Sequence, residues 1–366
     1  MHYGDSQLEC DRISCDIRSK FQEDFGGCGV GLVPAVQTIG TYTLSQSASD
    51  GITRYLVYGL ADMRASHNSY GVMGQVANIQ ETGQLSFAGV GKNYPTSQSF
   101  NRITILASGN GRIKLTVADS IYNVTDSLVE MGCGVYTVSL QTPAKKAELS
   151  VSGNVNIMGI MLDGYKGVSV DNIPMRGCSG TIFTKINRNT LQPFFSHENV
   201  KLIILQYGGN SVPYLKPGKS LDTYKNSIKR QIALFKELEP DACILFIGPA
   251  DMATNHNGNM ETYPYLEDVI NALKEAANEE CVAFWDMYAA MGGRNSIVKW
   301  VKNNPQLAGG DYIHFTPRGA KEIANMLYST IQLYYQQYRA RHYKDEMVAL
   351  EHVVHVETID TKINKE

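Results

Sequence analysis

Two different rhythms of apolar residues divide the chain. From residue 167 onward, short continuous apolar runs alternate with segments in which apolar residues recur every three or four positions. Continuous runs are typical of strands buried on both faces, and the longer period is typical of amphipathic helices. Strands and helices that alternate along a chain favour a parallel sheet covered by helices on both faces.

This rhythm predicts a series of elements in the second half of the chain. The predicted strands are 168–173, 202–206, 242–247 and 282–286. The predicted helices are 221–238, 265–278, 295–301 and 318–338, and another helix is expected to begin at Thr181. Pro240 ends the first of these four helices. The last should begin at Thr316-Pro317, with Thr316 as N-cap and Pro317 at the first helical position.

The start of the chain has the same character. Met1 to Tyr3 reads as the end of a buried strand, and residues 10–25 read as a helix. The glycine-rich run 26–31 is expected to end that helix and form a loop. A dinucleotide-binding loop is disfavoured, because this run follows a helix instead of opening one and lacks the G-x-G-x-x-G spacing.

Residues 32–166 follow a period of two. Short alternating runs predict the strands 53–58, 84–88, 102–107, 113–117, 134–140 and 147–151. The sequence 108–111, Ser-Gly-Asn-Gly, is a hairpin signal between two of these strands. Many short strands without a long helix favour an antiparallel β-sandwich or jelly roll. We therefore predict one α/β domain from 1–31 and 167–345, an inserted β-sandwich at 32–166, and a charged tail at 346–366.

Composition excludes several classes of function. The net charge is −3 and basic residues form no run longer than a pair, which argues against a nucleic-acid partner. No apolar stretch reaches the roughly 18 residues of a membrane span. The seven cysteines are scattered and lack a C-x-x-C pair, so neither a disulfide framework nor a zinc site is predicted.

Two short segments at opposite ends of the chain carry candidate chemistry. Gly4-Asp5-Ser6 places a hydroxyl between a strand and a helix, where backbone N–H groups at the helix start can stabilise negative charge. Asp311 and His314 stand three residues apart just before the last helix. Taken singly, each pattern is weak, because Gly-Asp-Ser triplets are common in turns and a D-x-x-H match often arises by chance.

Two further blocks, 177–180 and 208–210, lie between these segments, each after a strand-like run. In this order, the four blocks resemble the SGNH/GDSL hydrolase superfamily, whose signature residues would be Ser6, Gly180, Asn210 and His314. The resemblance implies a flavodoxin-like three-layer α/β/α fold and an acyl-enzyme on the serine. One departure is Gln7, which replaces the leucine of the commonest first block and is expected to be tolerated.

The residue types fit serine hydrolysis. His314 is the candidate base for Ser6, and Asp311 would fix its tautomer and stabilise the imidazolium. The backbone N–H groups of Ser6 and Gly180 and the amide of Asn210 would form the oxyanion hole. Asp5 is expected to be a turn residue or a supporting group behind the serine, not a catalyst.

Simpler interpretations exist for other polar residues. Gly180 also fits a helix-start glycine, and Asn210 and Asp311 also fit turn positions. Ser179 lacks the spacing of a nucleophile elbow. Solvated surfaces account for Arg12 and Asp251 as well as a site rim does. His352 and His355 lack a third ligand, so no metal is predicted, and no cofactor is required.

The inserted sandwich narrows the expected substrate. An SGNH domain interrupted at this point is similar to the bacterial peptidoglycan O-acetylesterases, whose insert resembles a carbohydrate-binding module. That resemblance implies an acetylated glycan as substrate, with Tyr42, Tyr55, Tyr58 and Tyr70 available for stacking on sugars. Two alternatives are an exported polysaccharide O-acetyltransferase with the same Ser-His-Asp site and a glycan-binding protein with a vestigial site. No pattern predicts an oligomeric state.

The beginning of the chain suggests a cellular location for the protein. Only three residues precede Gly4, although a full buried strand is expected before such a serine. We therefore expect upstream residues, including a signal peptide, to be absent from this chain, and the protein to be periplasmic or otherwise exported.

Overall fold

The computed structural model describes residues 1–342. The chain divides into two compact units, Met1–Ala324 and Asn325–Glu366. Helix α7 (Pro317–His342) ends at the last described residue. The predicted tail 346–366, with His352 and His355, lies outside the described residues.

A five-stranded parallel sheet forms the centre of the first unit. Its strands are β1 (His2–Gly4), β11 (Asn172–Pro174), β12 (Leu202–Gln206), β13 (Cys243–Ile247) and β16 (Ala283–Trp285). Their spatial order is β11-β1-β12-β13-β16, and every neighbouring pair is parallel. In order of sequence this is 2-1-3-4-5, the flavodoxin-like arrangement. The order reverses beside β1, and ligands bind at such a point, beyond the carboxyl ends of the strands.

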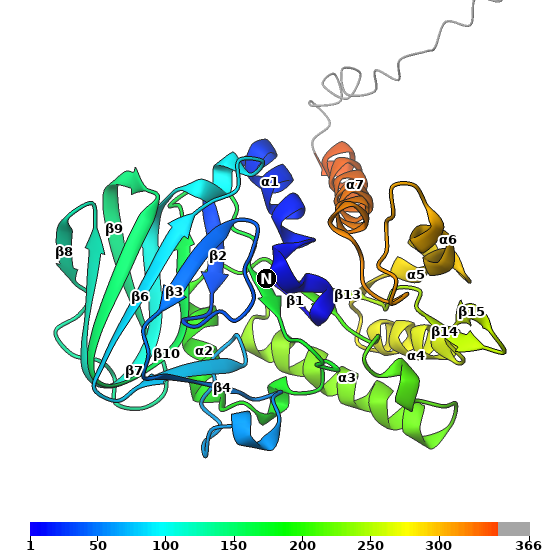
Figure 1. Ribbon diagram of the computed structural model, residues 1–366, viewed down its shortest axis with the longest axis horizontal. Coiled ribbons are helices and arrows are strands. Elements are labelled where there is room, and N and C mark those ends of the chain that lie inside the picture. Colours follow the sequence, from blue (N-terminus) through cyan, green and yellow to red (C-terminus); the bar gives the residue numbers. More distant parts are fainter. Residues whose placement is uncertain (343–366) are drawn as a thin grey trace, which may run out of the picture. The chain divides into compact units, whose positions relative to one another are not determined.

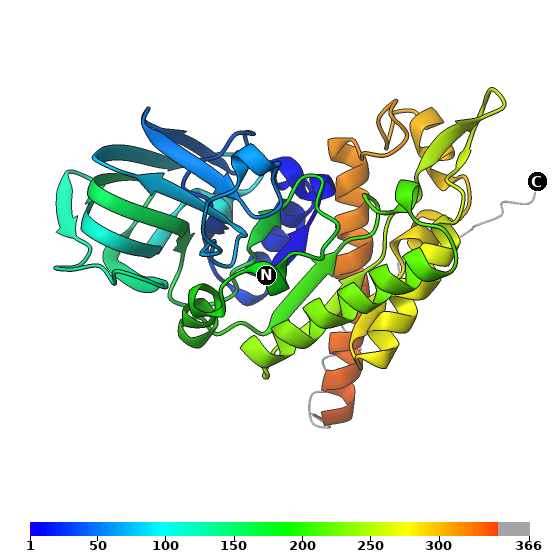
Figure 2. The same ribbon diagram turned by 90° about the horizontal axis from the view of Figure 1, so that it is seen from below.

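Helices cover both faces of this sheet. Successive side chains of a strand point to opposite faces. The ring of Tyr3 lies 5.1 Å from Phe183 and 5.2 Å from Phe235 of α3 (Lys219–Leu238). The neighbouring His2 ring contacts Ser14 at the start of α1 (Ser14–Phe25), at 3.0 Å. Figure 1 shows α1 above the sheet and α3 below it, and Figure 2 shows α3 beside α4 (Leu266–Glu279).

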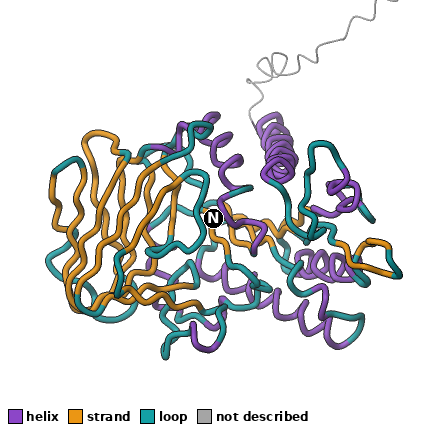
Figure 3. Tube along the Cα trace, in the orientation of Figure 1, coloured by secondary structure: helices purple, strands orange, loops and turns teal. Residues whose placement is uncertain are grey.

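A second, antiparallel sheet is made entirely of residues between β1 and β11. Its strands are β2 (Gly29–Val33), β3 (Leu44–Ala48), β4 (Ile52–Leu56), β5 (Gln75–Ile79), β6 (Thr82–Gly89), β7 (Phe100–Val117), β8 (Ser120–Asn123), β9 (Gly134–Ala144) and β10 (Lys146–Asp163). It has a separate hydrophobic core, which includes Ile105, Leu115 and Leu149. The strands gather in one region of Figure 3. The predicted fold class, a parallel α/β sheet interrupted by an antiparallel β insertion, is confirmed.

Several shorter elements complete the described chain. They are the hairpin β14–β15 (Ala253–His256 and Asn259–Thr262), the helices α2 (Arg188–His197), α5 (Met287–Met291) and α6 (Ser296–Lys302), and the 3₁₀ helices η1 (Ser6–Asp11), η2 (Ala61–Met63), η3 (Pro95–Gln98), η4 (Phe183–Lys185) and η5 (Val212–Tyr214). The hairpin and η1 matter for the site, because they stand after β13 and β1 respectively.

The hairpin expected at 108–111 is wrong. β7 runs straight through this segment, and Gly109 pairs with Val155 of β10. Gly109 has φ +128°, and Gly153 of the partner strand has φ +93°. The glycines therefore bend two long strands together across the sheet instead of reversing one of them.

Two predicted boundaries near the N-terminus also need correction. The first helix begins at Ser14 and not at residue 10, because Cys10 and Asp11 have φ of +62° and +63°. Strand β2 already begins at Gly29, so only the first part of the run 26–31 is a loop. At the other end, the predicted N-cap is confirmed, because Thr316 Oγ1 accepts a hydrogen bond from the N–H of Gly319 at 3.2 Å.

Candidate active site

Ser6 is the first residue of η1, directly after β1. Asp5 caps this turn, because its Oδ1 accepts a hydrogen bond from the Gln7 N–H at 3.0 Å. Gly4 packs closely against Leu8, and a Cβ there would lie 2.8 Å from Leu8 Cδ1, so a larger residue would have to displace that side chain. The sharp exit from the strand leaves Ser6 only 9% exposed. A hydroxyl held in this way has few rotamers and a fixed direction.

The Ser6 hydroxyl meets the imidazole predicted from the other end of the sequence. Ser6 Oγ lies 2.8 Å from His314 Nε2. His314 stands in the loop before α7, and Tyr312 of that loop has φ +57°. In the tautomer that carries its proton on Nδ1, the ring accepts the hydrogen bond from the Ser6 hydroxyl.

Asp311 fixes that tautomer. Its Oδ2 accepts a hydrogen bond from His314 Nδ1 at 2.7 Å. Its Oδ1 accepts from the backbone N–H groups of Ile313 and His314, both at 3.0 Å. Burial raises the pKa of Asp311, but the hydrogen bonds from the side chain and backbone of His314 and from Ile313 outweigh it, so the net pKa is lowered. The carboxylate therefore stays charged beside the ring at neutral pH.

Gln7 holds the loop that carries the histidine, a role that the sequence did not suggest. Its Nε2 donates to the carbonyl of Ile313 at 2.7 Å, and its Oε1 accepts from the N–H of Phe315 at 3.3 Å. These two backbone groups flank His314 on either side. Arg12 adds a third contact, from Nη1 to the Phe315 carbonyl at 3.1 Å. Both side chains therefore tie the serine turn to the histidine loop.

Asn210, which follows β12, faces the same turn. Its Nδ2 donates to Asp5 Oδ2 at 2.9 Å and to the Cys178 carbonyl at 3.2 Å. Burial raises the pKa of Asp5 to about 6, although the Gln7 N–H, the nearby His314 and Asn210 all oppose the change. The longer contact, to Cys178, is the one that an incoming oxyanion could replace most readily.

Gly180 occupies a left-handed backbone position in the loop after β11 that glycine adopts without strain. Its φ is +78°, and a Cβ there would come within 2.6 Å of the Tyr207 ring. Its N–H donates to Cys178 Sγ at 3.3 Å. Among the described residues, the wall of the pocket at Ser6 includes Arg176 and Gly177 of this loop but not Gly180. The predicted role of the Gly180 N–H in an oxyanion hole stays a prediction.

A pocket of about 300 Å³ opens over these groups. Ser6, Asn210 and His314 line it, together with residues that follow β12 and β13. Asp251 is among them and is fully buried; its oxygens accept hydrogen bonds from Thr262 Oγ1 and the Ile297 N–H, so a solvated surface does not account for it. Ser179 Oγ forms a hydrogen bond with Thr181 Oγ1, and Ser179 does not line the pocket.

The described residues 1–342 contain neither a metal-binding cluster nor a membrane-spanning helix. No group of three or more His, Cys, Asp or Glu side chains there is arranged to hold a metal ion. No helix in the same range combines the length and apolar character that crossing a membrane requires.

Comparison with known proteins places this geometry in context. The model of the GDSL-like lipase/acylhydrolase family matches residues 126–322 of the chain. The match contains Gly180, Asn210, Asp311 and His314. No curated protein sequence matches the chain.

Among solved structures, the whole described architecture has a counterpart. A structure titled as a peptidoglycan O-acetylesterase in action superposes with a TM-score of 0.73 at 20% identity, covering 91% of this chain and 90% of that one. A family two carbohydrate esterase from Clostridium thermocellum in complex with cellohexaose matches at a TM-score of 0.33 and 11% identity, covering 78% of this chain and 99% of that one. At 20% identity the first match shows a shared fold alone. The second match has a TM-score below 0.5, too low to show a shared fold.

Proposed function

Because the chain belongs to the GDSL-like lipase/acylhydrolase family, we propose that it is a serine esterase that removes O-acetyl groups from a carbohydrate polymer, peptidoglycan above all. The observation that carries the proposal is the chain of short contacts from Ser6 Oγ to His314 Nε2, at 2.8 Å, and from His314 Nδ1 to Asp311, at 2.7 Å. The fold shared with a peptidoglycan O-acetylesterase, insertion included, supports the choice of polymer.

Acylation begins with the serine. As Ser6 Oγ attacks the acetyl carbonyl carbon, its proton passes to His314 Nε2, and the carbonyl electron pair moves onto oxygen. Asp311 stabilises the imidazolium that forms. The Asn210 amide and the backbone N–H groups of Ser6 and Gly180 meet the oxyanion. When the tetrahedral species collapses, the sugar oxygen leaves with the proton from His314, and the acetyl group stays on Ser6.

Deacylation repeats the sequence with water. His314 takes a proton from the water that attacks the acetyl-serine, and acetate leaves as Ser6 Oγ regains that proton. Peptidoglycan lies outside the cytoplasm, so the proposal implies an exported, periplasmic location. It requires no metal or cofactor.

Ser6→Ala tests the nucleophile. We expect acetate release from aryl acetates and from O-acetylated peptidoglycan to fall by at least about 10³-fold, because the covalent route is lost. Ser179→Ala is the matched control. The Ser179 hydroxyl forms a hydrogen bond with Thr181 and does not line the pocket, so this variant should keep near-normal turnover. Unchanged hydrolysis by Ser6→Ala would contradict the proposal. Acetate transferred to an added acceptor glycan, in place of free acetate, would indicate an acetyltransferase.

A further inference from the structure

A second, larger cavity adjoins the pocket at Ser6. Its volume is about 650 Å³, within the range of small-ligand sites. Residues 9–11 and 172–177 of the α/β part form one side, and residues 30–44 and 54–63 of the β insertion form the other. Arg176 and Gly177 line both this cavity and the pocket at Ser6. We call it the Arg54 cavity, and the two shared residues place it directly beside the pocket at Ser6.

Most of the cavity wall is apolar. Leu32, Leu44 and Leu56 are buried beneath it, while Leu60 is 73% exposed at its edge. Tyr58 is the one aromatic residue among the described residues that line it. Sugar rings usually stack on aromatic side chains, so this wall suits alkyl groups better than a run of sugars.

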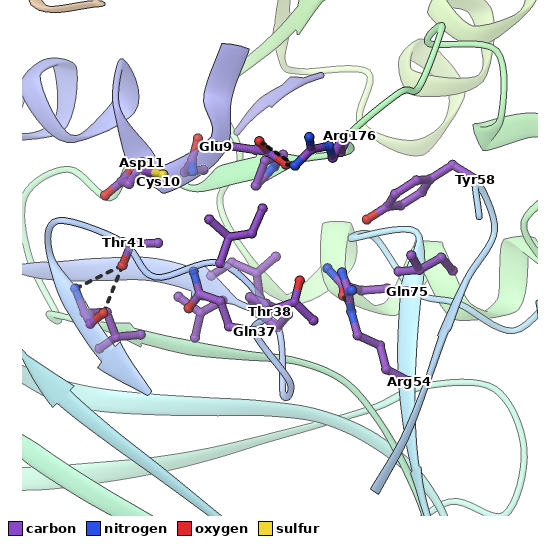
Figure 4. Close-up of a pocket in the computed structure, with 18 of the residues that line it drawn as sticks. Glu9, Cys10, Asp11, Gln37, Thr38, Thr41, Arg54, Tyr58, Gln75 and Arg176 are labelled. Atoms are coloured by element: carbon purple, nitrogen blue, oxygen red, sulfur yellow. Dashed lines mark hydrogen bonds and ion pairs between the residues drawn. The ribbon is translucent and has the colours of Figure 1, made fainter. Parts of the chain in front are cut away.

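Arg54 is the unusual group in this wall. Its Nε donates to Gln75 Oε1 at 2.7 Å, which fixes the guanidinium. Within residues 1–342, no carboxylate forms an ion pair with it. Figure 4 shows the Arg54 head beside Gln75, with the Tyr58 hydroxyl pointing toward the same space. A fixed guanidinium without an acidic partner is a ready site for a carboxylate, because its planar fork matches the two oxygens.

The other two arginines among the described residues that line the cavity each face a carboxylate. Arg18 and Asp11 are buried and form a two-pronged ion pair at 2.7 and 3.1 Å. Arg176 of the shared wall faces Glu9 at 3.5 Å (Figure 4). Burial raises the pKa of Tyr58 to about 12, opposed by the nearby Arg54, so its hydroxyl stays a neutral donor at pH 7.

We propose that the Arg54 cavity binds a carboxylate-bearing, partly apolar substituent of the acetylated glycan, with Arg54 and Tyr58 as donors and the leucines against its alkyl part. This inference rests on the proposed esterase function and refines its substrate. In peptidoglycan the sugars carry lactyl groups to which short acidic peptides are attached, so the carboxylate can come from the peptide or from a lactyl group freed of it. Neutral acetylated oligosaccharides have neither.

The test compares Arg54→Gln with wild type on four acetylated substrates. These are peptide-bearing peptidoglycan fragments, the same fragments freed of peptide, a neutral xylo-oligosaccharide and an aryl acetate. We expect kcat/KM to fall about tenfold or more on at least one of the first two, mainly through KM, because a charge-assisted contact is lost. The last two substrates should be unaffected. The affected substrate identifies the source of the carboxylate.

Controls separate this site from general effects. Arg112→Gln removes the same charge from an exposed side chain of β7 outside the cavity wall and should leave all four rates unchanged. Arg54→Lys keeps the charge without the fork and should fall between wild type and Arg54→Gln. Equal rates for Arg54→Gln and wild type on every substrate, or an equal loss on all four, would overturn the proposal.

A binding measurement remains decisive even if the esterase proposal fails. Titration of Ser6→Ala with a deacetylated muropeptide should give saturable binding that weakens about tenfold or more when Arg54→Gln is added. No binding, or binding that Arg54→Gln leaves unchanged, would overturn the cavity assignment. Absent acetate release from wild type, with Arg54-dependent binding intact, would overturn the esterase function alone.

Discussion

Ser6 and His314 are 308 positions apart, yet their reactive atoms lie 2.8 Å from each other. Both residues could be predicted from the sequence because four short blocks occur in the order that the SGNH/GDSL resemblance requires, although each block alone is weak. Gln7 could not be interpreted in the same way. Its partners are the backbone groups of Ile313 and Phe315, and backbone atoms look alike in every sequence.

Gln7→Leu should therefore impair catalysis and not only stability. Losing two neutral hydrogen bonds to the loop around His314 is expected to lower kcat about tenfold, because the imidazole loses its fixed direction. KM should change little, since Gln7 acts through His314 and is a positioning residue. The measurement is steady-state kinetics on an aryl acetate, well below the melting temperature of the variant.

Gln46→Leu provides the control for this change. Gln46 also bonds two backbone groups, the carbonyls of Pro34 and Ala35, but it does so in the β insertion. We expect a comparable loss of stability from Gln46→Leu with kcat unchanged. If both variants lost the same fraction of kcat, the proposed role of Gln7 in orienting His314 would be refuted.

Asp5 should make stability depend on pH. Its pKa in the folded protein is raised to about 6 from 3.8, so the folded state holds this proton more tightly than the unfolded state. The stabilising contribution is complete below about pH 3.8 and is lost as the pH rises to about 6, a change of roughly 2–3 kcal/mol.

Asp5→Asn removes this titration. The difference in unfolding free energy between wild type and Asp5→Asn should shift in favour of the variant between pH 4 and 6 and level off above that. Denaturant unfolding at a series of pH values measures it. A difference that does not vary with pH would show that the carboxyl titrates normally.

At the scale of elements, the strands and helices of the α/β part were predicted more accurately than the strands of the β insertion. The strand Leu202–Gln206 and the helix Lys219–Leu238 agree with expectation to within two residues, because buried strands and amphipathic helices have distinct periods. The hairpin Ala253–His256 with Asn259–Thr262 was missed, since its four-residue strands carry no clear alternation.

In the β insertion, glycines misled the prediction. Ser108 to Gly111 has the composition of a turn, but it crosses the sheet beside Gly153 of the neighbouring strand. Whether such glycines reverse a strand or bend it depends on the partner strand, which lies some forty positions later in the sequence. The long strand Phe100–Val117 was therefore predicted as two short ones, and Lys146–Asp163 was predicted only over 147–151.

At the scale of the molecule, the order of the parallel sheet explains why distant motifs meet. β1 lies between β11 and β12, so the segments after these three strands emerge at one edge of the sheet. They carry Ser6, the loop 175–180 and Asn210. The rule for parallel sheets allowed this convergence to be predicted. The Arg54 cavity could not be predicted, because its wall comes from several separate segments of the chain and depends on how the insertion packs.

The central claim is that Ser6 is a nucleophile activated by His314, and covalent labelling tests it most directly. Wild type treated with a fluorophosphonate should gain one adduct, mapped to Ser6 by mass spectrometry of its peptides. His314→Ala should label at least about a hundredfold more slowly, because the hydroxyl loses its base. An adduct at another residue, or equal labelling rates for wild type and His314→Ala, would contradict the account.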